Sequence, residues 1–588
     1  MTISSFSKVL ETIEQTTLRN QITQELAKLF NELDKDEIEP ACWLLLGRIV
    51  PPYEGIEFQF AEKMMIRAIA EALQIAPEKV TREYKKEGDL AKVAQSQFSI
   101  SNLQFSRQHH SVEDVYAKLK QLALENGEGS QERKIAIVVE LLKQLDPVSV
   151  KFVVRIILTK LRLGFSDMTI LDALSWSVQG DKSDRPLLEE AYQNKHDIGK
   201  LAKQYIGLKM KGKGSSELLK EFTVELGIPI QPALCQRLKT AQEMIDKMGK
   251  IVAESKYDGT RVQIHIKNSK FKIQNSKEWK VRTFTRSLEE SSNQFPELSE
   301  AITHFGHHDI ILDCEAVGFD PKTGKLLAFQ ETIQRKRKHG VEEMSQKIPL
   351  RFFVFDVLYK DGKSLLSIPL AERKKNLHDL FEELHTNTKE TIFVESAFIV
   401  TESADELRTF HTQQLANGLE GAVIKQYESV YQPGRKGWSW VKFKEEEGTA
   451  AKLSDTIDAV VMGYWYGKGK RNQFGIGAFL IGIQGKNEEI LTLSKVGTGL
   501  SDEQWKELKG RCEKEVSASQ PKQYLVDKLL IPDVWVSPAI VVEVAGDELT
   551  KSPNHSAGLA LRFPRLVKFR DDKSVKDITT QKELSSIR

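Results

Sequence analysis

A lysine with an acid, a glycine and an arginine close behind it is the first group of residues in the chain that could do chemistry. It stands in the string Glu254-Ser-Lys256-Tyr-Asp258-Gly259-Thr-Arg261. A lysine acts as a nucleophile only when it is deprotonated, which a neighbouring cation, a metal or burial promotes. Glycine lets the backbone come close to a ligand, and arginine can grip a phosphate through two parallel N–H groups. If the string stood alone, an ordinary strand and turn would be the better explanation, because such strings often occur by chance.

Two further pairs of charged residues alternate along predicted strands. Asp313 and Glu315 are two residues apart, so both carboxylates face one side of a strand, and together with Glu420 they predict an oxygen-rich site suited to Mg²⁺. Lys442 and Lys444 likewise share one strand face, as a grip on phosphate requires. Each pair has a plainer interpretation, since charged residues also occur on exposed edge strands, where they discourage aggregation.

Strings of the same kind recur along the chain in a fixed order. Lys256-Tyr-Asp-Gly259 resembles motif I of the covalent nucleotidyltransferases, the superfamily of DNA ligases, RNA ligases and mRNA capping enzymes. The later motifs of that superfamily are matched in family order and with sensible spacing, which chance does not explain. The matching strings are Thr283–Arg286, Leu312–Glu315, Phe353–Asp356, Glu420–Lys425, Trp440–Lys444 and Arg562–Lys573, the last of which resembles motif VI.

The resemblance implies a role for each motif. Lys256 would attack the α-phosphate of ATP and carry the AMP, with Mg²⁺, or Mn²⁺ as the alternative, held by Asp313, Glu315 and Glu420. Glu254 would contact adenine, on which Phe355 could stack. The residues that would bind ATP or AMP are Glu254, Tyr257, Arg261, Arg286, Glu315, Phe355, Lys442 and Lys444. Those of motif VI that would act in the adenylation step are Arg562, Arg565, Arg570, Asp572 and Lys573.

The first 225 or so residues are predicted to be helical almost throughout. Asp146-Pro147 marks a helix start, and the helix is expected to continue through Leu163 until Gly164 ends it. At 100° per residue Lys151, Arg155 and Arg162 fall within about 40° of one another. They predict a basic stripe opposite an apolar face, although a solvated helix face is an equal alternative.

The same region narrows the family. The string Phe152–Gly164, followed by Ile170–Leu174, closely resembles the helical DNA-binding domain of ATP-dependent DNA ligases of the archaeal and eukaryotic replicative type. Gly463–Arg471 and Lys495–Gly499 are similar to the OB-fold domain of that family. The predicted DNA-contacting residues are Lys151, Arg155 and Arg162 in the helical region and Lys468, Lys470 and Arg471 near the other end.

Three domains are expected. The string Gly227–Pro232 cannot be regular helix, and short β-like runs such as Val262–Ile266 and Phe352–Leu358 follow it. A second change follows the acidic residues 445–447, after which the chain is rich in β-like runs and fits a small barrel. The sequence therefore predicts a multidomain protein: an all-α DNA-binding domain at 1–226, an α+β adenylation domain at 227–446 and an all-β OB-fold domain at 447–588.

Composition excludes several other classes of protein. Lys+Arg 85 against Asp+Glu 83 leaves a net charge of +2, which excludes a uniformly basic nucleic-acid binder. The four cysteines form no C-x-x-C pair, which argues against a disulfide scaffold and a cysteine-built zinc site and suits a reducing compartment. The N-terminal string is predicted to be a helix rather than a signal peptide, and no apolar run is long enough for a membrane. We expect a prokaryotic cytoplasmic protein associated with the nucleoid, or a nuclear one in a eukaryote.

The expected reaction is the sealing of a 5′-phosphate to a 3′-hydroxyl at a nick in duplex DNA, by a monomer acting in replication, repair and recombination. A sliding clamp is a possible second partner, because some replicative ligases bind one through a Q-x-x-aliphatic-x-x-aromatic-aromatic string. Gln97 and Ile100 match the first half of that string, but Leu103 and Gln104 stand at the positions of the two aromatic residues. Motif VI also has Lys568 where arginine is usual, and Cys314 replaces a small residue. Glu445 to Glu447 stand where the family often has further lysine.

Three alternatives stay open. An RNA ligase or capping enzyme shares the central motifs but gives no reason for the long helical region. An NAD-dependent ligase would need a zinc finger that the cysteines cannot supply. A catalytically silent DNA-binding clamp is disfavoured because the motif lysines and acids are all present. The choice of ATP over ADP or GTP is an expectation only.

Overall fold

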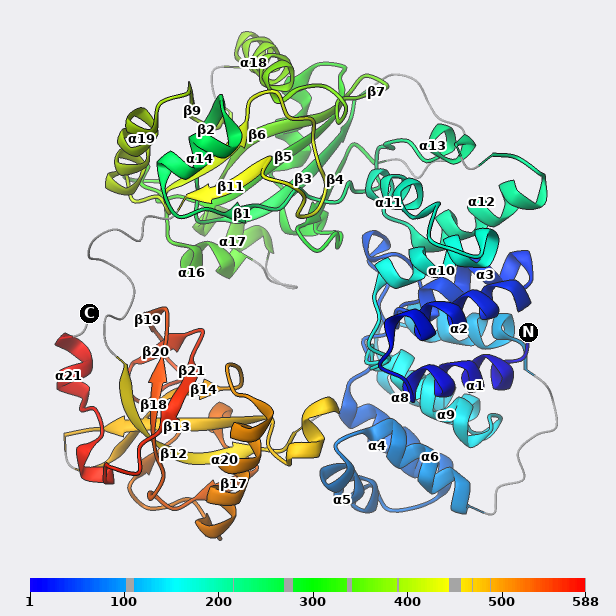
Figure 1. Ribbon diagram of the computed structural model, residues 1–588, viewed down its shortest axis with the longest axis vertical. Coiled ribbons are helices and arrows are strands. Elements are labelled where there is room, and N and C mark those ends of the chain that lie inside the picture. The colour runs from blue at the N-terminus through cyan, green and yellow to red at the C-terminus, as the bar shows by residue number, and fades with distance from the viewer. Residues whose placement is uncertain are drawn as a thin grey trace. The chain divides into compact units, whose positions relative to one another are not determined.

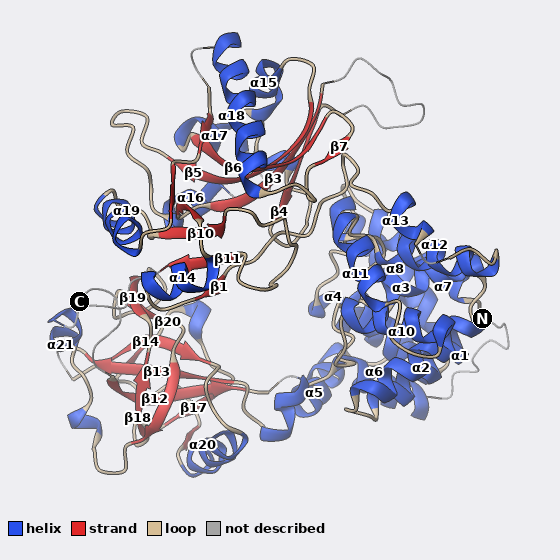
Figure 2. Ribbon diagram, turned by 45° about the horizontal axis from the view of Figure 1, so that its top comes forward, coloured by secondary structure: helices blue, strands red, loops and turns tan. Residues whose placement is uncertain are grey.

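The computed structural model describes residues 1–101, 110–214, 216–268, 279–335, 341–388, 391–443, 456–467, 469–486 and 488–586. The chain divides into two compact units. The first comprises Met1–Ala61 and Phe105–Glu446, and the second comprises Glu62–Gln104 and Glu447–Arg588. Figures 1 and 2 show that strands occur in the central and C-terminal parts of the chain, whereas the N-terminal part is helical.

The helical part of the first unit follows the expected pattern of caps. Asp146 accepts hydrogen bonds from the N–H groups of Val148 and Ser149, and Pro147 takes the first helical position, as predicted. The helices are α1 (Ile3–Glu14), α2 (Arg19–Glu32), α3 (Lys35–Leu44), α7 (Val112–Leu124), α8 (Ser130–Lys143), α9 (Pro147–Ile157), α10 (Asp167–Gln179), α11 (Arg185–Asn194), α12 (Ile198–Met210) and α13 (Glu217–Glu221).

One predicted helix is shorter than the sequence suggests. Helix α9 ends at Ile157 and not at Leu163, so the expected end at Gly164 is wrong. The chain turns back after Leu158, where the N–H of Lys160 bonds the Arg155 carbonyl at 2.8 Å. Thr159 and Arg162 take positive φ angles of 53° and 59°, which side chains rarely adopt. Arg162 therefore lies in a tight loop and not on the helix that carries Lys151 and Arg155.

The central part of the first unit is α+β and contains two sheets. One has the strand order β1-β11-β10-β2-β9 and the other β4-β3-β5-β6-β7, with β8 beside β6. The predicted strands Val262–Ile266 and Phe352–Leu358 are confirmed within β3 and β6. The strands are β1 (Gln236–Arg237), β2 (Ile251–Ser255), β3 (Thr260–Lys267), β4 (Val281–Thr285), β5 (Asp309–Gly318), β6 (Leu350–Lys360), β7 (Lys363–Ser364), β8 (Phe393–Glu395), β9 (Phe398–Thr401), β10 (Ala422–Gln426) and β11 (Trp440–Phe443).

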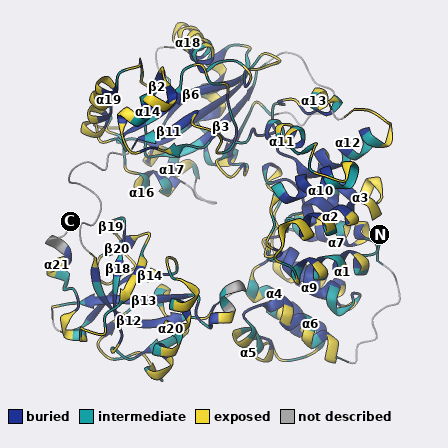
Figure 3. Ribbon diagram, in the orientation of Figure 1, coloured by how far each residue is buried: buried dark blue, intermediate teal, exposed yellow. Residues whose placement is uncertain are grey.

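Each central sheet has its own apolar core, drawn largely as buried in Figure 3. Helices α14 (Ala241–Met248) and α19 (Ala404–Ala416) share a core with β2 and β10, and α18 (Leu370–Asn387) shares one with β3, β5 and β6. A third group of buried side chains, including Ile311, Tyr431 and Trp440, joins residues from both sheets. The shorter helices of this part are α15 (Leu298–Ala301), α16 (Phe329–Thr332) and α17 (Val341–Lys347).

The second unit holds three helices from the N-terminal part and a β-rich C-terminal part. The helices are α4 (Glu62–Leu73), α5 (Pro77–Glu87) and α6 (Leu90–Ile100). The C-terminal sheet has the order β15-β17-β12-β13-β14-β16, with β18 beside both β12 and β21. Its main strands are β12 (Ile457–Trp465), β13 (Ala478–Gln484), β14 (Ile490–Val496), β17 (Val534–Val536), β18 (Val541–Ala545), β20 (Leu559–Arg562) and β21 (Arg565–Phe569).

The shorter C-terminal elements are β15 (Val516–Ser517), β16 (Tyr524–Leu525) and β19 (Glu548–Lys551), with helices α20 (Asp502–Lys514) and α21 (Gln581–Ser586). The order of a helical, an α+β and a β-rich part is thus confirmed. An all-β C-terminal part is not, because Trp505, Leu508 and Cys512 of α20 are buried in its core.

A buried ion pair joins helix α18 to strand β6 of the second central sheet. The Nε and Nη2 groups of Arg373 on α18 donate to the two carboxylate oxygens of Asp356 on β6 at 2.9 and 3.1 Å. Neither side chain is more than 1% exposed. Burial acts to raise the pKa of Asp356, but Arg373, Lys425 and Lys374 outweigh burial and the pKa is lowered.

Arg373→Ala should lower the free energy of unfolding by about 3–5 kcal/mol, because it leaves the Asp356 carboxylate buried without its partner. Lys247→Ala is the matched control, since it removes an exposed ion pair in which Lys247 lies 3.1 Å from Glu243 and should cost less than about 1 kcal/mol. Urea unfolding of the full chain, followed by tryptophan fluorescence, measures both. Equal shifts for the two variants would contradict this account.

Candidate active site

The predicted nucleophile lies in the short connection between β2 and β3. Lys256 donates its backbone N–H to the carbonyl of Gly421 at 3.0 Å, and its own carbonyl accepts from the N–H of Glu420 at 3.0 Å. These two bonds join the connection to the residues just before β10. The Lys256 side chain is 24% exposed, and its Nζ forms an ion pair with the Glu420 carboxylate. Lysine and glutamate, predicted from separate motifs, are therefore in contact.

Two glycines allow this close approach of segments. A Cβ on Gly259 would lie 2.4 Å from the carbonyl oxygen of Ala316 on β5. Gly421 has a φ of 115°, and a Cβ there would lie 2.8 Å from the Phe443 carbonyl. The sequence predicts that Gly259 lets the backbone approach a ligand. In the structure, the absence of a side chain at Gly259 lets strand β5 pack close to it.

Acidic groups gather around Lys256. Burial raises the pKa of the Glu315 carboxyl to about 7, against the opposing effect of Arg261 and Lys256 and with a further rise caused by Asp313 and Glu420. The pKa of Asp258 is also raised, first by burial and then by Glu420. Ionisation of Asp258 and of Glu315 is therefore costly in the folded protein, mainly because both carboxyl groups are withdrawn from water.

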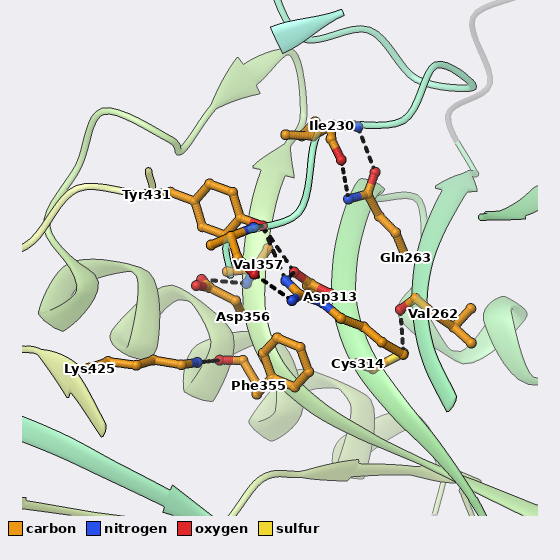
Figure 4. Close-up of polar contacts among 12 residues, drawn as sticks. Ile230, Val262, Gln263, Asp313, Cys314, Phe355, Asp356, Val357, Lys425 and Tyr431 are labelled. Carbon is orange, nitrogen blue, oxygen red and sulfur yellow. Dashed lines mark hydrogen bonds and ion pairs between the residues drawn. The ribbon is translucent and has the colours of Figure 1, made fainter. Parts of the chain in front are cut away.

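The predicted phosphate-binding arginine and one predicted metal ligand contact each other. Nε and Nη2 of Arg261 donate to the two oxygens of Asp313 at 2.9 and 2.6 Å, and the Tyr431 hydroxyl donates to Asp313 at 3.2 Å. Figure 4 shows the ring of Tyr431 close to Asp313. Asp313 is 1% exposed on its side chain. Within the described ranges of the chain, no three His, Cys, Asp or Glu side chains stand together as a metal-holding set, so Asp313, Glu315 and Glu420 are not gathered as one.

Glu254 is buried between two lysines that the sequence interpretation did not assign. Lys374 Nζ lies 2.7 Å from one oxygen of Glu254 and Lys425 Nζ lies 2.8 Å from the other. Lys425 also donates to the Phe355 carbonyl at 3.4 Å, as Figure 4 shows. Lys425 ends the motif string Glu420–Lys425, so the sequence does carry a signal for this residue. Lys374 stands between Arg373 and Lys375 on α18 and carries no signal in the sequence that distinguishes it from a solvated residue.

Aromatic rings border the same pocket. Phe355 on β6 is half-buried, 6.1 Å from the Trp440 ring, with the Arg261 guanidinium 5.4 Å from its centroid. The ring of Tyr257 stacks on Phe353 at 3.9 Å, so that ring already has a neighbour within the protein.

The remaining predicted nucleotide-binding residues lie at the ends of strands. Arg286 follows β4 and is exposed, and Lys442 is half-buried on β11. Lys444 lies outside the described residues. The central part therefore brings together Lys256, Glu420, Glu315, Arg261 and Asp313, and separately Glu254 and Phe355 around Lys425.

Family models cover most of the chain and agree with this arrangement of parts. The DNA ligase N terminus matches residues 2–175, the ATP dependent DNA ligase domain matches 232–444, and the ATP dependent DNA ligase C terminal region matches 472–573. The chain belongs to the ATP-dependent DNA ligases. The resemblance drawn from the motifs is confirmed, and with it the enzyme class, whose reaction seals nicks in DNA.

Named relatives of this ligase align with it over almost their whole length. The "Probable DNA ligase" of Dictyoglomus turgidum is 37% identical, with 99% of this chain and 97% of that protein aligned. "DNA ligase 2" of Korarchaeum cryptofilum is 36% identical over 99% of this chain and 96% of that protein. A solved structure named "Pmar-Lig_PreS3" shares the fold with a TM-score of 0.55 at 16% identity, over 96% of this chain and 99% of that chain.

The predicted basic stripe of the ligase's helical part is not exposed. Lys151 Nζ lies 3.0 Å from both Glu11 and Glu14, and Arg155 Nη2 lies 2.7 Å from Glu14. Both basic side chains are at most 5% exposed because α1 covers them. The 3.6-residue period places these residues on one face of α9, but it does not show that a second helix packs on that face.

Of the other predicted DNA-contacting residues, Arg162 lies in a turn and Arg471 in a short 3₁₀ helix, Gly469–Phe474. Arg162 is half-buried in the turn after α9. Arg471 donates to the Gly477 carbonyl at 2.8 Å. Lys468 and the side chain of Lys470 lie outside the described residues.

The motif VI residues of the ligase lie in the second unit. Arg562 ends β20 and is exposed, and Arg565 begins β21, where it forms an ion pair with Asp547 at 2.9 Å. Arg570 and Lys573 both contact Asp458, and Arg570 also contacts Asp572. The basic groups of this motif are therefore held by acids of their own unit.

In the described part of the chain, no helix is both long and apolar enough to cross a bilayer.

Glu315→Gln should stabilise the metal-free protein at pH 8 and leave its stability unchanged at pH 5. The Glu315 carboxyl has a pKa of about 7 against an ordinary 4.5. The folded state therefore holds the proton more tightly, and the stability that it contributes is complete below pH 4.5 and lost as the pH rises through 7. A neutral Gln avoids that loss, which is roughly 1–3 kcal/mol at pH 8. Urea unfolding at the two pH values measures the effect.

Glu428→Gln, which changes an exposed glutamate of the same central part, is the control and should change stability by less than about 0.5 kcal/mol at either pH. A Glu315→Gln effect of equal size at pH 5 and pH 8 would rule out burial of the carboxylate as its cause.

Proposed function

We propose that this ligase joins a 5′-phosphate to a 3′-hydroxyl at a nick in duplex DNA by way of an AMP carried on Lys256. The observation that carries the proposal is the contact between Lys256 Nζ and Glu420 in a connection anchored to β10. Neighbouring Asp258 and Glu315 make the pocket acidic, and Arg261 lies beside it. An amine next to a carboxylate base, with cationic groups nearby for phosphate, is the arrangement that phosphoryl capture needs.

In the first step Lys256 passes its proton to Glu420 and its free amine attacks the α-phosphorus of ATP. A nitrogen–phosphorus bond forms as the bond from the α-phosphorus to the bridging oxygen breaks, and pyrophosphate leaves with that electron pair. Splitting one transfer into two in this way is covalent catalysis. Asp572 and Lys573 of motif VI orient the leaving pyrophosphate.

The next two steps use the AMP to activate DNA. An oxygen of the 5′-phosphate attacks the α-phosphorus as the nitrogen–phosphorus bond breaks, and the Lys256 amine takes back the proton that Glu420 held. The 3′-hydroxyl oxygen, which gives its proton to water, then attacks the phosphorus of the adenylated 5′-phosphate. The new phosphodiester bond forms as the bond from that phosphorus to the bridging oxygen breaks, and AMP leaves with that electron pair. Contacts to the DNA backbone dominate such binding, so it should be independent of sequence and weaken with salt.

The site fits Mg²⁺ through Glu315, while Glu420 serves as the base for Lys256. Mg²⁺ prefers oxygen ligands and usually takes one or two protein carboxylates, completing its shell with waters and substrate phosphates. Burial raises the pKa of Glu315, and a cation bound beside this carboxylate would offset that cost. Bound there, Mg²⁺ would neutralise charge on the reacting phosphates. Asp313 is paired with Arg261, so its part is to hold that arginine in place.

Glu254, Phe355 and the two lysines form the adenine end of the pocket. An ionised carboxylate accepts a hydrogen bond from the exocyclic amine of adenine, and a guanine carbonyl at the same place would face it with like charge. Lys374 and Lys425 hold the two oxygens of Glu254 from either side and fix the direction of its carboxylate. ATP would then be preferred over GTP, because adenine can donate a hydrogen bond to the buried Glu254 carboxylate and the carbonyl of guanine cannot.

Lys374→Met should raise the KM for ATP in lysyl-AMP formation roughly tenfold and narrow the preference for ATP over GTP. The change removes one of the two cations at Glu254, so the carboxylate is less firmly held. Lys375→Met is the matched control, since the neighbouring side chain is exposed and should leave both quantities unchanged. Adenylation measured with labelled ATP and with labelled GTP gives the KM for ATP and the preference for ATP over GTP. If Lys374→Met and Lys375→Met had the same values, Lys374 would not be the residue that positions Glu254.

The domain boundaries expected from the sequence, 1–226, 227–446 and 447–588, complete the proposal. The helical domain binds nicked DNA, and the β-rich domain is an OB-fold, in which β12 lies beside β13, β17 and β18. The enzyme acts as a monomer in DNA replication, repair and recombination, in a prokaryotic cytoplasm. The clamp-binding string ends at Leu103 and Gln104, outside the described residues, so clamp docking stays an expectation from the sequence.

Lys256→Ala should abolish labelling by α-labelled ATP while leaving binding to nicked DNA roughly intact, because only the nucleophile is lost. Lys250→Ala, an exposed lysine of the same part, is the control and should be labelled normally. A denaturing gel with peptide mapping locates the label, and gel-shift titration measures DNA binding. Normal sealing from ATP by Lys256→Ala would remove Lys256 as the nucleophile. Discharge of the label by RNA ends alone would favour an RNA ligase.

A further inference from the structure

Two basic residues of motif VI share one carboxylate in the second unit. Asp458 on β12 accepts from Nη1 of Arg570 at 2.9 Å with one oxygen and from Nζ of Lys573 at 2.6 Å with the other. The three side chains are 14%, 16% and 31% exposed, respectively. Asp458 is 112 residues from Arg570 in the chain and belongs to none of the family motifs quoted from the sequence.

The backbone of Asp458 is fixed from both sides. Asp458 lies opposite Glu543 in the pairing of β12 with β18. Its N–H donates to the Thr579 hydroxyl at 3.1 Å, and its carbonyl accepts from the Thr579 N–H at 2.9 Å. A carboxylate on such a strand has little freedom to follow the two cations. The two cations adjust their positions to the carboxylate instead, because the charged groups of arginine and lysine lie at the ends of long flexible stems.

Other acids complete the neutralisation of Arg570. Nε and Nη2 of Arg570 donate to Asp572 at 2.8 and 2.7 Å, and Glu543 lies 3.4 Å from Nη1. Glu543 also lies 3.5 Å from Lys568. Arg570 thus has acids on each side, whereas Asp458 is the acid that Arg570 and Lys573 have in common.

A shared carboxylate overcomes the repulsion between two cations. Without it, the positive heads of Arg570 and Lys573 would move apart, because like charges in contact are destabilising. With it, both heads lie within a hydrogen-bond length of the same carboxylate group. Arg570 and Lys573 also line a cleft of about 640 Å³ together with Arg511 and Lys514 of α20 and the acids Glu507, Glu515 and Asp571. Asp458 is not among the lining residues, so it contacts the two cations from outside that cleft.

We infer that Asp458 is a positioning residue for the adenylation step, which holds Arg570 and Lys573 together as a two-point grip for the diphosphate end of ATP. The inference rests on the proposed function, in which motif VI acts on the leaving pyrophosphate. Asp458 forms and breaks no covalent bond. Its effect is confined to the transfer of AMP to Lys256, because the later steps release no pyrophosphate.

The test is Asp458→Asn, which keeps the size of the side chain and removes its charge. Lysyl-AMP formation from labelled ATP at varied ATP concentration should show a KM about tenfold higher. Sealing of a nick that already carries AMP on its 5′-phosphate should stay within twofold of normal, and this also reports that the variant is folded. Asp458→Glu, which keeps the charge, should recover most of the loss.

Glu513→Gln is the matched control, because it removes a second acid of the same unit that pairs with Lys509 at 3.0 Å. It should leave both reactions unchanged. Equal losses of adenylation and of sealing by Asp458→Asn would show a merely structural role and overturn the inference. Faster adenylation would overturn it too, since Asp458 would then be a competitor of the triphosphate.

The inference and the proposed function fail in different ways. If the unchanged protein forms no lysyl-AMP, the proposed function is wrong and the inference falls with it. If the unchanged protein is adenylated and Asp458→Asn matches it in KM, only the inference is wrong. Should Asp458→Asn not fold, Asp458→Glu provides the same comparison with an expected loss of about threefold, and no loss there would overturn the inference.

Discussion

A charge removed from water must meet an opposite charge, and this constraint organises the centre of the ligase. Between the two central sheets Arg373 meets Asp356, Arg261 meets Asp313, and Glu254 meets two lysines. Each pair costs desolvation and is stable only with good geometry and further hydrogen bonds. The geometry in turn fixes where the side chains at the nucleotide pocket point. Stability and catalysis here depend on the same ion pairs.

The charged groups beside Lys256 follow the same constraint in another way. Burial is the main cause of the raised pKa of Asp258 and of Glu315, and Glu420 adds to both shifts. Two carboxyl groups that are costly to ionise in the folded protein therefore lie beside the ion pair of Lys256 with Glu420. In the second unit the cation Arg570 is instead neutralised by Asp458, Glu543 and Asp572.

Much of the fold and of the candidate site could be predicted from the sequence, because the motif residues are recognisable by their type and spacing. The helix start at Asp146, the strands β3 and β6, and the nearness of Lys256 to Glu420 follow from such patterns. The burial of Lys151 and Arg155 under α1 could not, since periodicity shows a face and not its neighbour. Lys374 was missed for the same reason, and Asp313 was assigned to a metal because no pattern shows its contact with Arg261.

The backbone bonds between Lys256 and residues Glu420 and Gly421 have a consequence for synthesis of the protein. The partner acid lies 164 residues further along the chain than the nucleophile. A ribosome therefore makes Lys256 long before Glu420 and Gly421 exist, and a partly made chain lacks the surroundings that this lysine has in the folded protein. The contacts around Lys256 can form only when most of the central part has been synthesised.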